Sequence, residues 1–284
     1  MTQFRQIAAA PIFAVLMMAL AIGLPLAPRA QAAERERIEA FLATTGFDVA
    51  LDSIAFASSS APEMLGIDPG AFGQSWTRTV DDVFDTEVMR GIALDILEQT
   101  LSDEALNHAV EFYASDLGQR LVEAENASHM IEDDAAKQEE GKAIVAELVR
   151  DGSDRVETLK RMNAAIDASG TSLRALQEIQ LRFLMAASAA GVIELKVGPE
   201  EMRAMMQANE GAMRSALQMS ALAGAAYTYQ DFTDAEVAAY TEALEQPPMQ
   251  EVYELLNAVQ YEIMANRFEV LAARMADLHP AQEL

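Results

Sequence analysis

The stretch that decides the fold is Leu101 to Glu123, "LSDEALNHAVEFYASDLGQRLVE". Ser102 is followed at once by two acids and then by an apolar face at helical spacing, an order typical of a helix N-terminus. The chain breaks at Ser115, and Leu117 and Leu121 then repeat one turn apart. The pattern predicts two antiparallel helices joined by a tight turn, an αα-hairpin.

The same pattern recurs at an offset of 131 residues, where "LSDEALNHAVEFYASDLGQRLVEAEN" aligns with "FTDAEVAAYTEALEQPPMQEVYELLN", which starts at Phe232. Thr233 and Glu236 have the spacing of a capping box. A weaker match at the same offset pairs residues 55–64 with 186–195. Chance similarity between two amphipathic helices is the alternative, but the number of matches favours two diverged copies of one helical unit.

The rest of the chain after Ala33 also follows the helical period, and strand-like alternation is scarce. Gly152 and Gly170 each follow a helical stretch and indicate helix ends. The least regular part is 58–75, which is rich in Ser, Pro and Gly and indicates a loop. We therefore expect an all-α, bundle-like fold of two related helical units built around the hairpins, with the first at 33–152 and the second at 153–284.

Residues 1–32 are predicted to be a secretory signal peptide. Arg5 precedes an apolar run from Ile7 to Leu26, and Ala30-Gln31-Ala32 has the small-x-small form of a cleavage site. An uncleaved membrane anchor is the alternative, because the run is nearly long enough to span a bilayer. The prolines after the run favour cleavage, so we expect a periplasmic protein with no stable membrane insertion after cleavage.

The composition limits the classes of partner. The net charge is −25, and it becomes −27 without residues 1–32, whose only charged side chains are Arg5 and Arg29. Such a surface repels nucleic acid phosphates and anionic headgroups, so no nucleic acid partner is expected. The chain has no Cys and therefore no disulfide or thiol chemistry.

The hairpin sequence resembles the core motif of a bacterial family called domain of unknown function 2059. The family pattern runs from a Leu/Phe-Ser/Thr start through Phe-Tyr-x-Ser-x-x-Gly into a second helix. Ala105 and Asp116 depart from it, and the copy at Phe232 is degenerate. The resemblance implies exported, all-helical proteins with no established activity and no catalytic residues to transfer. The residues that fit the motif are Leu101, Ser102, Leu106, Phe112, Tyr113, Ser115, Gly118 and Leu121.

One metal-binding hypothesis rests on His108, which has Glu104 one turn before it and Glu111 one turn after it. Helical bundles build metal sites from carboxylates and imidazoles at this spacing, but they need a matching set on a facing helix. The second copy has Ala239 at the position of His108. A solvated pair of charged and polar side chains is the favoured interpretation, and no metal or other cofactor is expected.

Met residues crowd the helical stretch from Glu200 to Met219, including Met202, Met205 and Met206. Thioethers can bind Cu(I), but helical spacing favours a buried or groove-lining stripe, which could also form a pliable interaction surface. Trp76, the single Trp, is expected to be a core anchor, with a cleft-lining position beside a Gly-rich loop as the alternative.

No catalytic residue is predicted, because the sequence contains no Cys nucleophile, G-x-S-x-G elbow, H-E-x-x-H or P-loop. The sequence therefore predicts a binding, interaction or scaffold protein, with another envelope protein or peptide as its partner. A metal-binding or envelope-stress protein is the alternative, and an enzyme is the least favoured class.

Overall fold

The computed structural model describes residues 27–58, 61–68 and 72–278. This part of the chain consists of helices and connecting turns, with no strand, and the predicted all-α fold is confirmed. The helices are α1 (Ala27–Thr44), α2 (Phe47–Ser58), α3 (Ala61–Met64), α4 (Gln74–Val83), α5 (Thr86–Thr100), α6 (Asp103–Tyr113), α7 (Asp116–His129), α8 (Asp134–Arg150), α9 (Arg155–Ile166), α10 (Ser172–Ala189), α11 (Pro199–Ala208), α12 (Glu210–Thr228), α13 (Asp234–Leu244) and α14 (Pro247–Met275).

Helices α6 and α7 form the predicted hairpin, and each begins at a serine cap. The Ser102 hydroxyl accepts a hydrogen bond from the backbone N–H of Ala105 at 3.2 Å. The Ser115 hydroxyl accepts one from Gly118 at 3.1 Å. Each cap satisfies a backbone donor that the first helical turn leaves without a partner, so these two hydroxyls fix where the helices start.

The second hairpin, α13 and α14, repeats the helix boundaries of the first. Both ends of α6 recur in α13 and the start of α7 recurs in α14 at the offset of 131 residues. Helices α2 and α10 also end at this offset. The copies differ afterwards, because the first unit turns between α7 and α8, whereas α14 continues without a break to Met275. The shared boundaries support duplication, and the division at residue 152 stays a prediction.

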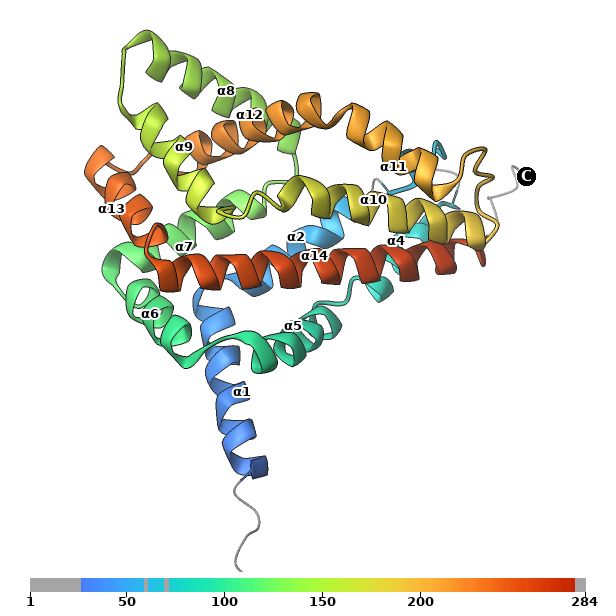
Figure 1. Ribbon diagram of the computed structural model, residues 1–284, viewed down its shortest axis with the longest axis horizontal. Helices are drawn as coiled ribbons and strands as arrows, with labels where there is room; N and C mark the ends of the chain where they lie inside the picture. Colours follow the sequence, from blue (N-terminus) through green and yellow to red (C-terminus); the bar gives the residue numbers. More distant parts are fainter. Residues whose placement is uncertain (1–26, 59–60, 69–71, 279–284) are drawn as a thin grey trace, which may run out of the picture.

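The two predicted units share one hydrophobic core. Most buried side chains of both units, from Ile38 in α1 to Met275 in α14, belong to a single connected cluster. Figure 1 shows the long α14 crossing the molecule, with α10 of the second unit and α5 and α6 of the first packed along it. Helix α8 of the first unit in turn packs on α12 of the second, and a Cβ built on Gly141 would lie 2.1 Å from the backbone oxygen of Ala223. Glycine therefore permits this close helix contact.

The apolar run of the predicted signal peptide lies outside the described residues. Helix α1 starts at Ala27, so the predicted cleavage position after Ala32 falls within its backbone. After that position α1 buries Ile38, Phe41 and Leu42 in the core. Among the described helices, none combines the length and the apolar character that crossing a bilayer requires.

Candidate functional site

The residues of the family motif build the hairpin. Leu106, Tyr113 and Leu121 are buried, and Leu101 and Phe112 pack against the core. A Cβ on Gly118 would lie 2.3 Å from the backbone oxygen of Phe112, so only glycine lets α7 start this close to the end of α6. With Ser102 and Ser115 acting as caps, the motif is accounted for by packing and helix capping.

Among the described residues, the fold brings no cluster of metal-ligating side chains together around His108. His108 is partly exposed, and Glu104 and Glu111 on the same helix are exposed. Across the described residues, no group of three or more His, Cys, Asp or Glu side chains converges in a way that could hold a metal ion.

Two of the four side chains considered for an interaction surface are buried. Trp76 and Met202 are only 6% and 8% exposed, and Trp76 packs beside Phe72 with ring centroids 5.9 Å apart. This burial agrees with the favoured interpretation of Trp76 as a core anchor and of Met202 as part of a buried stripe. Met205 is 56% exposed and Met206 is partly exposed, so they remain at the surface of α11.

A buried cluster of tyrosines around Glu125 joins the two hairpins. The hydroxyls of Tyr229 and Tyr240 donate to the same Glu125 oxygen, Oε1, at 2.6 and 2.9 Å. The Tyr253 hydroxyl lies 2.8 Å from that of Tyr240 and 2.5 Å from that of Tyr113. Glu125 and Tyr113 come from the first predicted unit and the other three from the second, so the cluster exists only when the two halves are packed together.

Burial sets the protonation of this cluster. Removal from water raises the pKa of the Glu125 carboxyl, although hydrogen bonds from Tyr229 and Tyr240 act in the opposite direction. Burial also raises the pKa of the hydroxyls of Tyr113, Tyr229, Tyr240 and Tyr253. The tyrosines are therefore neutral hydrogen-bond donors around a carboxyl group that holds its proton more tightly than an exposed glutamate.

A small, half-open cavity of about 110 Å³ lies beside the cluster, and we call it the Glu125 cavity. It is lined by the turn between α1 and α2, the first turn of α2, the end of α6, the last turns of α7 and the middle of α14. Its walls carry Glu125, His129 and the amides of Asn126 and Asn257. The Asn257 amide donates to the backbone oxygen of Ile166 at 2.8 Å, which fixes its orientation.

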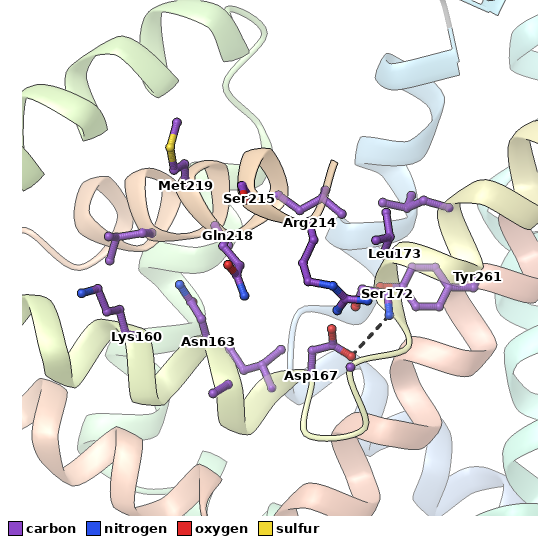
Figure 2. A pocket seen from close by; sticks show the side chains of 17 residues that line it. Lys160, Asn163, Asp167, Ser172, Leu173, Arg214, Ser215, Gln218, Met219 and Tyr261 are labelled. Atoms are coloured by element: carbon purple, nitrogen blue, oxygen red, sulfur yellow. Dashed lines mark hydrogen bonds between the residues drawn. The ribbon is translucent and has the colours of Figure 1, made fainter. Parts of the chain in front are cut away.

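A larger groove of about 790 Å³ lies between α9, α10 and α12, with Tyr261 of α14 at its base. Apolar side chains form most of its wall, and the Tyr261 hydroxyl donates to Ser172 at 2.8 Å. Figure 2 shows Arg214 reaching from α12 toward Ser172 and Asp167. The groove is lined by Lys160, Asn163, Ala164, Ile166, Asp167, Gly170, Ser172, Leu173, Leu176, Arg214, Ser215, Leu217, Gln218, Met219, Ala221, Leu222 and Tyr261.

Sequence reasoning missed both cavities. Tyr240 and Tyr253 stand at positions where the first copy has Ala109 and Val122, so comparing the copies does not bring them together. Glu125 gave one weak signal, because it follows the buried Leu121 by one helical turn and therefore falls on an apolar face. An acid on an apolar helix face is unusual, because acidic side chains are rarely buried without a partner.

The comparison with protein families confirms the resemblance seen in the hairpin. The model of a family described as an uncharacterized protein conserved in bacteria (DUF2059) matches residues 87–147, which span most of α5, the hairpin α6–α7 and most of α8. No curated protein and no solved structure was found to match the chain. The matched family carries no assigned activity.

Proposed function

We propose that the protein is an exported binding protein whose α9–α10–α12 groove holds the apolar face of a helical segment from another envelope protein. The observation that carries this proposal is the groove itself. Its volume of about 790 Å³ is in the range of ligand sites, and its wall is largely apolar with a few polar groups.

The rim of the groove suits a helix. Met219 at the edge is 63% exposed, and unbranched thioether side chains adapt to apolar partners of varied shape. Met205 and Met206 lie on α11, which packs against α10 and α12 beside the groove. An amphipathic helix would place residues spaced three and four apart into such a groove.

Charge favours a basic partner. Arg214 and Lys160 at the rim are each paired with an acid on their own helix, Glu210 and Glu157, both at 2.7 Å. The rim therefore adds little positive charge to a chain with 45 acidic and 20 basic residues. A helical segment with Lys and Arg on its polar face would be attracted to this surface.

Photocrosslinking tests the proposal with a matched pair of positions on α12. Ala221 lines the groove, whereas Ala216 is equally exposed on the same helix but does not line it. Each is replaced by benzoylphenylalanine in the full-length protein expressed in its own cells. We expect a discrete protein adduct from position 221 alone, with the crosslink mapped by mass spectrometry to a basic amphipathic helix.

Binding of a synthetic peptide with the mapped sequence completes the test. Ala221→Trp fills the groove and should weaken binding about tenfold or more, whereas Ala216→Trp should leave it unchanged. Equal adducts at the two positions, or an adduct with a small molecule at position 221, would contradict the proposal.

A further inference from the structure

The Glu125 cavity combines a partly buried acid with a missing counter-charge. Within the described residues, no Lys, Arg or His forms an ion pair or hydrogen bond with Glu125. Its hydrogen-bond donors among these residues are two neutral hydroxyls, those of Tyr229 and Tyr240, both to Oε1. A carboxylate that is partly removed from water without a cation beside it is costly, so this environment favours the protonated form of Glu125.

The cavity offers what an organic cation requires. Three aromatic residues, Phe47, Tyr113 and Tyr253, line the cavity, and the faces of aromatic rings attract ammonium groups. Glu125 is the one carboxyl group in its lining, and the side-chain amides of Asn126 and Asn257 supply polar groups that can orient a ligand. A volume of about 110 Å³ holds several groups the size of a water molecule, which suits the head of a small amine.

We propose that the Glu125 cavity binds a small organic ammonium ion, with the carboxylate of Glu125 as its counter-ion and the three aromatic rings around it. The charge of the ligand replaces the cation that the fold does not provide. Helices α2, α6, α7 and α14 line this cavity, whereas the proposed peptide groove lies between α9, α10 and α12. The two proposals therefore concern different sites, and a failed test of one does not contradict the other.

Binding of the ammonium ion is expected to depend on pH, because Glu125 must lose its proton to act as the counter-ion. A cation beside Glu125 lowers the pKa that burial has raised, so below that pKa binding releases a proton and affinity increases with pH. The other titratable groups that face the carboxyl are Tyr113, Tyr229, Tyr240, Tyr253 and His129. Lys137 donates to the Ser128 backbone oxygen at 3.3 Å and forms an ion pair with Asp134 at 2.9 Å.

The first test is calorimetry of the full chain with choline and ethanolamine, and with 3,3-dimethyl-1-butanol, the uncharged analogue of choline. We expect at least one of the two amines to bind and the uncharged analogue not to bind. Glu125→Gln preserves an acceptor for the two tyrosines but removes the charge, so it should weaken binding about tenfold or more. Glu123→Gln, at an exposed position on the same helix, should bind like the parent chain.

A second variant keeps the test independent of folding. Ala50→Leu adds volume to the α2 wall of the cavity and leaves Glu125 in place, and it should also abolish binding. Far-UV circular dichroism checks that each variant is folded. Equal affinity of Glu125→Gln and the parent chain, tight binding of the uncharged analogue, or no binding of either amine at millimolar concentration would overturn the proposal.

The same ammonium chemistry occurs free and on lipid headgroups, and vesicles separate the two sources. Sedimentation with phosphatidylethanolamine vesicles that is lost in Glu125→Gln would assign the lipid-borne amine. Binding of free amine without sedimentation would assign the soluble one.

Discussion

At the scale of single residues, Gly118 occupies a position in the hairpin where a side chain has no room. A Cβ at this position would meet the backbone of Phe112 and Tyr113 at 2.3 and 2.7 Å, and backbone atoms cannot move aside. We expect Gly118→Ala to lower the free energy of unfolding by about 1–3 kcal/mol through overpacking. Gly91→Ala is the control, because its Cβ meets nothing within 4 Å and alanine favours the helix interior. Urea denaturation measures both, and equal stability of the two variants would contradict this account.

The raised pKa of Glu125 predicts that the stability of the protein depends on pH. Burial holds the pKa of its carboxyl above 4.5 in the folded state, so the folded chain keeps a proton that the unfolded chain releases. Its contribution to stability is therefore complete below the unfolded pKa and is lost as the pH rises through the folded pKa. We expect the parent chain to lose stability relative to Glu125→Gln across this range, by at most about 1.4 kcal/mol per pH unit. Denaturation of both proteins at several pH values measures the difference, and a difference that does not change with pH would contradict the prediction.

At the scale of the elements, the start of α13 joins the two hairpins. Thr233 and Glu236 form a capping box, and Arg120 on α7 forms an ion pair with Glu236. The hydrogen bond from Arg120, followed by those from Thr233, lowers the pKa of Glu236 to about 2. The stabilisation from this carboxylate is complete above the unfolded pKa of 4.5 and is lost as the pH falls toward 2.

Glu236→Gln should therefore destabilise the protein at neutral pH and have a progressively smaller effect between pH 4.5 and 2. Glu254→Gln, an exposed acid on α14, is the control and should show no such trend. Thermal unfolding followed by circular dichroism measures both variants. An effect of Glu236→Gln that is equally large at acidic and neutral pH would exclude the ion pair as its cause.

Helix starts could be predicted from the sequence, whereas contacts between distant helices could not. Ser102, Ser115 and Thr233 mark helix starts because a cap is a local interaction, readable from a few neighbouring residues. The pairing of α8 with α12 could not be read in this way, since it depends on contacts between distant parts of the chain. For the same reason the Glu125 cavity was not predicted, although the motif tyrosine Tyr113 belongs to its wall.

At the scale of the whole molecule, the predicted signal peptide determines which residue begins the exported chain. Cleavage after Ala32 would leave a chain of net charge −27 that begins with Ala33. We expect N-terminal sequencing of protein from the periplasmic fraction to read Ala33, Glu34 and Arg35. Full-length protein in the membrane fraction would instead identify residues 1–32 as an uncleaved anchor.

The shared core makes a prediction about cooperativity. The tyrosine cluster, the α8–α12 contact and the packing of α14 on α5 and α6 each join the predicted unit 33–152 to the unit 153–284. Neither unit can expose these surfaces and remain folded alone, so the chain should unfold in one transition. Trp76 fluorescence reports on the surroundings of α4, whereas far-UV circular dichroism reports on all helices. We expect the two signals to coincide in urea, and Tyr240→Phe to shift both midpoints by the same amount. Separate midpoints, or a shift of one signal alone, would mean that the two copies still unfold as independent domains.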